Sequence, residues 1–181
     1  MTSSCLWQPF LSILLLVTGI GTAQADGTLP APHHLTIADG MSRSTEDALL
    51  LPARRYYAFW QTGEAHYAQQ ALAADFTDLN LPAGRPQGPT GPLVASAQFR
   101  KAVPDLSVTV DQAFVVGDHV ISQLTFTGHF SGRLGDKAGD GREIRFVAID
   151  NYTIRDGHIQ ANWHLEDNLT LMRQLGLVAP N

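Results

Sequence analysis

The second half of the chain alternates apolar and polar residues, and this period of two is typical of β-strands that bury one face. The pattern covers residues 106–116, 120–130, 144–154 and 158–169. Asp156-Gly157, between the last two stretches, is typical of a two-residue hairpin turn. The sequence therefore predicts about four long antiparallel strands that share one apolar face.

Three helices are predicted ahead of these strands. Ser44 and the acidic residues after it are typical of a helix N-terminus; Pro52 is expected to break and restart that helix, and Gly63 to end it. The other two helices are expected over Glu64–Ala73 and Leu93–Val103. The predicted fold is α+β: a cone-shaped, curved antiparallel sheet packed on three N-terminal helices and enclosing an apolar pocket.

The N-terminal residues predict a signal peptide over residues 1–25. Leu11–Ile20 is an apolar run, too short to span a bilayer, and Ala23-Gln24-Ala25 fits a signal-peptidase site, although no Lys or Arg precedes the run. Residues 26–43 are rich in Pro, Ala and Gly and are interpreted as a flexible tether, and residues 44–181 as the folded domain. We therefore expect a periplasmic or secreted protein without a stable membrane anchor after cleavage.

Composition excludes several function classes. The net charge of −5 over 181 residues gives no electrostatic case for nucleic-acid binding. The only cysteine, Cys5, lies ahead of the apolar run, so the mature chain would have no thiol for catalysis or metal binding. No phosphate-binding loop, nucleophile elbow or metal-ligand set is evident, and we expect no cofactor and no metal.

Two carboxylates interrupt the predicted apolar faces, Asp150 and Asp167. Pairing across the Asp156-Gly157 turn would place Asp150 opposite Trp163 and Asp167 opposite Phe146, roughly 13 Å apart. A carboxylate in an apolar pocket has a raised pKa and can serve as a general base, which suits Asp167. The alternative is that Asp167 caps a short helix beginning near Asn168.

The remaining polar residues of the last stretch fall on the opposite face. His164 and Glu166 share this face with His158 and Asn162, which predicts contact with solvent or with another subunit. His129 has the same parity as Thr125 and Thr127, so it too is expected to point away from the pocket.

Several motifs together resemble the SnoaL-like polyketide cyclases, also called ester cyclases, of the nuclear-transport-factor-2-like superfold. They are Phe99–Leu106, Thr127-Gly128 with Gly132, Arg155–Ile159, and Trp163-x-x-x-Asp167 followed by Gln174-Leu175-Gly176. The likeness spans roughly Ala53 to Leu177. It implies a deep pocket in which an aspartate, here Asp167, acts as general acid/base in an aldol ring closure without metal or cofactor.

The strand alternation and the resemblance together suggest a substrate-binding set made of Trp163, Tyr57, Phe130, Asp150 and Phe146. Two histidines that family members often carry are absent: Leu79 and Phe130 stand at those positions, which makes the pocket more apolar. The first functional hypothesis is a cofactor-free cyclase or isomerase acting on a small hydrophobic carbonyl compound. Alternatives are a non-catalytic module that binds a lipophilic ligand and epoxide-hydrolase chemistry on the same superfold. A homodimer through the outer sheet face is also expected.

Overall fold

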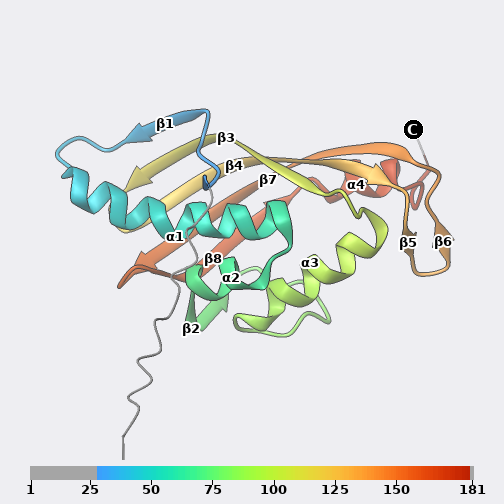
Figure 1. The fold of residues 1–181 in the computed structure, drawn as a ribbon, viewed down its shortest axis with the longest axis horizontal. Helices are drawn as coiled ribbons and strands as arrows, with labels where there is room; N and C mark the ends of the chain where they lie inside the picture. The colour runs from blue at the N-terminus through green and yellow to red at the C-terminus, as the bar shows by residue number, and fades with distance from the viewer. Residues whose placement is uncertain (1–27, 180–181) are drawn as a thin grey trace, which may run out of the picture.

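The computed structural model describes residues 28–179, so the predicted signal peptide at residues 1–25 lies outside the described residues. The main element is a curved, open six-stranded sheet with the order β1-β3-β4-β7-β8-β2 (Figure 1). The strands are β1 (His34–Ile37), β2 (Leu72–Asp78), β3 (Ser107–Val116), β4 (His119–Phe130), β7 (Arg142–Arg155) and β8 (His158–Glu166). The short strands β5 (Arg133–Leu134) and β6 (Lys137–Ala138) pair with each other.

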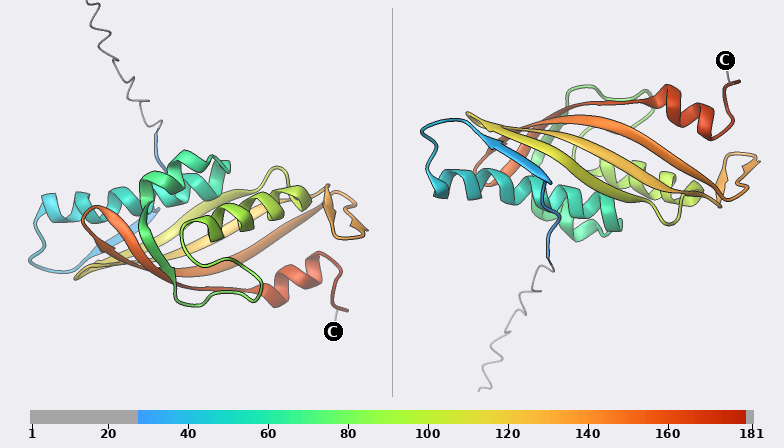
Figure 2. Two further views of the ribbon diagram at one scale, coloured as in Figure 1. Left: turned by 90° about the horizontal axis from the view of Figure 1, so that it is seen from below. Right: turned by 90° about the horizontal axis from the view of Figure 1, so that it is seen from above.

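Three helices cover one face of the sheet and a fourth follows the last strand (Figure 2). They are α1 (Arg43–Thr62), α2 (Ala65–Ala71), α3 (Thr90–Ala102) and α4 (Asn168–Gln174). The four central strands pair antiparallel, whereas β1 and β2 add to the two edges in parallel. The predicted α+β class with three helices on a curved sheet is confirmed. No helix between residues 28 and 179 is long and apolar enough to cross a membrane.

Helix α1 is one continuous helix, so the predicted break at Pro52 is wrong. Ser42 caps it by accepting a hydrogen bond from the Thr45 backbone, and Gly63 ends it with a left-handed φ of 78°. Pro52 is itself buried, next to Leu49 and other core residues of the helix. Packing of this apolar face outweighs the backbone hydrogen bond that a proline inside a helix removes.

The segment interpreted as a tether is part of the fold from residue 28 onward. His34–Ile37 form β1, which pairs in parallel with β3. Ahead of it, the Arg54 guanidinium donates hydrogen bonds to the carbonyl oxygens of Leu29 and Pro30, at 2.6 and 3.0 Å. The proline-rich composition of this segment therefore marks an edge strand and its approach rather than a flexible linker.

Two central strands have the faces that their periodicity predicts. The inward residues of β4 and β7 are buried, including the polar Ser122 and Asp150. They are Val120, Ser122, Leu124, Phe126 and Phe130 on β4, and Ile144, Phe146, Ala148, Asp150, Tyr152 and Ile154 on β7.

Bulges in the other two central strands change which residues face inward. In β3 an extra residue at Asp111 shifts the register, so Phe114 and Val116, predicted inside, are 39% and 48% exposed. In β8 the predicted register holds at Ile154–Ile159, but Thr153 pairs with Ala161 and leaves Gln160 as the extra residue. Beyond this bulge the even-numbered residues of β8 face the helices.

Candidate active site

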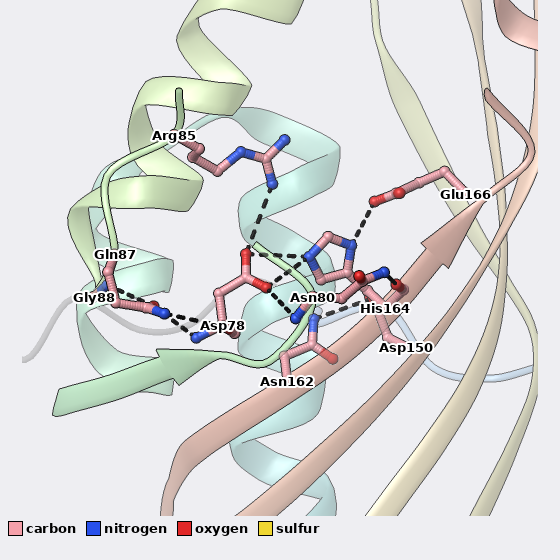
Figure 3. A network of polar contacts seen from close by, with 9 residues as sticks. All are labelled: Asp78, Asn80, Arg85, Gln87, Gly88, Asp150, Asn162, His164 and Glu166. Atoms are coloured by element: carbon pink, nitrogen blue, oxygen red, sulfur yellow. Dashed lines mark hydrogen bonds and ion pairs between the residues drawn. The ribbon is translucent and has the colours of Figure 1, made fainter. Parts of the chain in front are cut away.

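A pocket of about 430 Å³ lies between the helices and the inner face of the sheet. One part of its wall is aromatic and includes Phe126 and Phe146, which stack with their ring planes 8° apart and their centroids 5.0 Å apart. The other aromatic lining residues are Tyr56, Trp60, Phe76 and Phe99. Six polar lining residues gather where β2, β7 and β8 lie side by side (Figure 3): Asp78, Arg85, Asp150, Asn162, His164 and Glu166. Gln98 and Asn168 also line the pocket.

His164 lies between two carboxylates in this polar cluster. Its Nε2 is 3.0 and 3.1 Å from the two oxygens of Asp78, and its Nδ1 is 2.8 Å from Oε1 of Glu166. Burial lowers the pKa of His164, but the hydrogen bonds and negative charges of Glu166 and Asp78 outweigh burial and raise it to about 9. The ring is therefore an imidazolium at neutral pH, with both of its N–H groups directed at carboxylates.

Asp78 is held in place by the loop that follows it, residues 79–89. Gln87 accepts a hydrogen bond from the backbone N–H of Asp78 at 2.8 Å and donates one to its carbonyl oxygen at 3.0 Å. Asn80 donates its backbone N–H to Oδ1 of Asp78 and its side-chain amide to the carbonyl oxygen of His164. These contacts join the edge strand β2 to β8, and they bring Asp78 to His164 from 86 residues away in the chain.

Asp150 is the second buried acidic centre of the pocket. Its Oδ2 accepts a hydrogen bond from the Tyr152 hydroxyl at 2.7 Å, and its Oδ1 accepts one from the Asn162 amide at 3.1 Å. Burial raises the pKa of the Asp150 carboxyl, whereas these two hydrogen bonds act in the opposite direction. The buried Oδ1 of Asn162 has no hydrogen-bond partner within residues 28–179.

Tyr56, and not Tyr57, is the tyrosine of α1 that lines the pocket. Burial, reinforced by the negative charge of Asp150, raises the pKa of Tyr56 far above its ordinary value, so its hydroxyl stays protonated. The Tyr57 hydroxyl instead makes a short hydrogen bond with Ser122 in the core.

The residues predicted as a binding set separate into three groups. Phe146 and Asp150 line the pocket. Phe130 and Tyr57 are fully buried core residues outside the pocket lining. Trp163 is 42% exposed on the outer face of the sheet, because the bulge at Gln160 reverses its predicted orientation.

Asp167 lies outside the pocket lining and has an exposed side chain. It is the N-cap of α4, and its Oδ1 accepts a hydrogen bond from the Thr170 backbone at 3.0 Å. Hydrogen bonds from the side chain and then the backbone of Thr170 lower the pKa of the Asp167 carboxyl. The structure thus has the capping arrangement that was the alternative for Asp167, and the acid/base role implied by the family resemblance stays a prediction.

Strict alternation predicts that Asn162, His164 and Glu166 point away from the pocket. This prediction is wrong, because the bulge at Gln160 turns all three toward the pocket. His129, predicted to point away from the pocket, is exposed, lies outside the pocket lining and pairs with Asp105. A sequence signal for His164, which His129 lacks, is its place in the polar series Asn162, His164 and Glu166. A one-residue register shift places this series beside Asp150.

The sequence model of the SnoaL-like polyketide cyclase family matches residues 51–175. Among solved structures, a candidate polyketide cyclase of Bacillus cereus is 41% identical with a TM-score of 0.76, over 84% of this chain and 96% of that one. TsrD of Streptomyces laurentii is 26% identical with a TM-score of 0.66, over 76% and 99% of the two chains. A search of curated proteins found no match.

The fold has a more distant likeness as well. A Catenulispora acidiphila protein with a ketosteroid-isomerase-like fold is 19% identical with a TM-score of 0.57, over 71% of this chain and 94% of that one. This likeness concerns the fold alone, a curved and open sheet covered by helices. The extent of the family match and the identity to the Bacillus cereus protein decide the family. The chain belongs to the SnoaL-like polyketide cyclase family.

Proposed function

We propose that this protein is a cofactor-free acid/base catalyst of the cyclase or isomerase type, and that it acts on a small, largely apolar carbonyl compound. The observation that carries the proposal is the buried carboxylate of Asp150 in the wall of an aromatic pocket, with a raised pKa. A general base works best when its pKa lies near the working pH, and burial moves a carboxyl in that direction. Asp150 would remove a proton from the carbon next to the substrate carbonyl.

The other two acids of the pocket are less suited to this role. Burial alone would raise the pKa of Glu166, but the hydrogen bond and positive charge of His164 lower it below its ordinary value. Asp78 shares the same imidazolium and is further engaged by Asn80. In this proposal the hydrogen bonds of His164 hold these two acids in place, and Tyr56, whose hydroxyl stays protonated, lines the pocket that takes the ligand.

The proposal is tested by following deuterium incorporation next to the carbonyl of aryl ketones and 1,3-diketones in D2O by NMR. We expect exchange above the buffer rate, and a loss on the order of 100-fold in Asp150→Asn. This variant should fold. If the side-chain amide of Asn162 rotates by half a turn, its unpaired Oδ1 can accept a hydrogen bond from the amide N–H of the asparagine introduced at position 150.

Asp167→Asn is the matched control, because asparagine caps a helix about as well as aspartate does. We expect its exchange rate to stay within a few-fold of the unmodified protein. A large loss in Asp167→Asn with little change in Asp150→Asn would reverse the assignment and favour the acid/base role of Asp167. Ketones that bind without any exchange would instead support a ligand-binding protein, which the aromatic pocket wall also suits.

The proposal includes export to the periplasm or beyond, which rests on the pattern of residues 11–25 alone. It also includes a homodimer. On the outer face of the sheet, Val147, Ile149, Trp163 and Leu165 are all between 38% and 56% exposed, and Ile149 lies directly opposite Leu165. Burial of such a face against a second copy would remove this apolar surface from water.

For the homodimer, Leu165→Lys is the test. It places a charge in the middle of the apolar strip, so we expect the dimer dissociation constant to rise at least ~10-fold, since burying an unpaired charge is costly. Sedimentation equilibrium measures this constant. Gln69→Lys, at an exposed position of α2, is the control and should leave it unchanged. A protein that is monomeric before substitution contradicts the prediction.

A further inference from the structure

Arg85 is a cation of the pocket wall whose donors are little used by the residues that the structure describes. Its Nη1 is 3.9 Å from Oδ2 of Asp78, which is an ion pair but too long for a hydrogen bond. Within residues 28–179 this is the one polar contact of its guanidinium. The side chain is 25% exposed and lines the pocket. A guanidinium carries five N–H donors, so most of them are available to a ligand.

The loop that carries Arg85 is fixed to the fold at its far end. Gln87 binds both backbone groups of Asp78, and the Arg85 N–H closes a turn by donating to the carbonyl oxygen of Pro82. Gly84 and Gly88, on either side, have φ values of 81° and 85°, which other residues rarely adopt. The chain therefore holds Arg85 at the polar side of the pocket by specific contacts (Figure 3).

The polar cluster carries one net negative charge when Asp150 is ionised, and proton transfer to Asp150 would pass that charge to the substrate. Asp78 and Glu166 together carry −2, and His164 and Arg85 together carry +2, so the cluster is neutral whenever Asp150 is protonated. Proton abstraction breaks a C–H bond of the substrate and moves the proton to Asp150. The electron pair of that bond forms an enolate, so the negative charge passes from Asp150 to the substrate oxygen.

We propose that Arg85 is the oxyanion-binding residue of this pocket, and that its ligands are aromatic compounds bearing a carboxylate or an enolisable carbonyl. The enolate part of this inference rests on the proposed function, since it requires Asp150 to act as the base. A cation that is carried on an anchored loop, and whose donors the described residues leave largely unused, is suited to a charge that develops during reaction, because the site needs little reorganisation. Arginine is also the side chain best matched to the two oxygens of a carboxylate.

Two probes with the same ring system separate charge recognition from apolar packing. 2-Naphthoate carries a carboxylate, and 2-acetonaphthone carries a neutral methyl ketone at the same ring position. Calorimetric titration of both into the full protein and into Arg85→Gln should show a roughly 10-fold weaker affinity for naphthoate in the variant. The affinity for the ketone should change less than 2-fold. Arg85→Lys should recover part of the naphthoate affinity.

The inference is overturned if Arg85→Gln weakens both probes equally, if it leaves naphthoate binding unchanged, or if the unmodified protein binds only the ketone. An unchanged thermal midpoint in Arg85→Gln excludes a general loss of structure. These outcomes are independent of the exchange measurement on Asp150→Asn, because naphthoate has no proton next to a carbonyl that a base could remove. The proposal for Arg85 and the proposal for Asp150 can therefore be confirmed or contradicted independently.

Discussion

Replacing His164 by leucine is expected to lower the free energy of unfolding by about 3–5 kcal/mol, because it leaves the buried carboxylate of Asp78 and the half-buried carboxylate of Glu166 without their shared cation. Asp78 and Glu166 are within 3.1 Å of the imidazole nitrogens, and the His164 and Asp78 side chains are only 6% and 5% exposed. Leucine fills a similar volume, so the loss comes from electrostatics rather than from a cavity. Urea unfolding followed by tryptophan fluorescence measures it.

His129→Leu is the matched control for this substitution. His129 also pairs with a carboxylate, that of Asp105, but on the exposed face of the sheet, where such pairs stabilise little. We expect its unfolding midpoint to stay close to that of the unmodified protein. Adding Asp78→Asn and Glu166→Gln to His164→Leu should restore part of the lost stability. Equal effects of the two histidine substitutions would show that the pocket carboxylates do not depend on His164.

Stability should also fall as the pH rises through about 9. The pKa of His164 is about 9 in the folded protein, above the value of 6.5 for a free side chain. Between these values the folded state binds more protons than the unfolded state, so the stabilisation is complete below about pH 6.5 and is lost as His164 deprotonates. The full effect is on the order of 3 kcal/mol.

Urea unfolding at pH 6.5 and at pH 9.5, compared with the same measurements on His164→Leu, isolates this contribution. Other titrating groups change the stability of both proteins equally between these pH values. The variant should therefore lose less stability than the unmodified protein, and the difference is the contribution of His164. An NMR titration of the imidazole gives the pKa directly. A titration midpoint near 6.5 for His164 would show that Asp78 and Glu166 do not stabilise its charged form. The expected loss of stability at high pH would then have no basis.

The four central strands, three of the helices and the Asp156-Gly157 turn follow from local patterns. Both turn residues have positive φ values, 51° and 71°, as such a hairpin requires, and the pairing next to the turn is the predicted one. The bulges at Asp111 and Gln160 are different. Each is a single extra residue, and its position depends on how two strands pair in three dimensions. The alternation of residues along one strand therefore does not predict it.

The candidate site was predictable only in part for the same reason. Asp150 and Phe146 lie on β7, which keeps a regular alternation, so a pattern is enough to place them in the pocket. His164 and Glu166 lie beyond a bulge. Asp78 comes from a parallel edge strand whose contact with β8 is non-local. Arg85 is positioned by a loop that the side-chain amide of Gln87 anchors to the backbone of Asp78. No local sequence pattern predicts this contact.

The bulge in β8 also bears on how such a site can change during evolution. The strand carries two interleaved sets of side chains, Asn162, His164 and Glu166 on one face and Trp163 and Leu165 on the other. Loss of the single residue Gln160 would exchange the two sets, with the polar cluster turned to the surface and the apolar side chains turned to the ligand. A one-residue insertion or deletion, without any substitution, could therefore interconvert a charged pocket and an apolar one on the same fold.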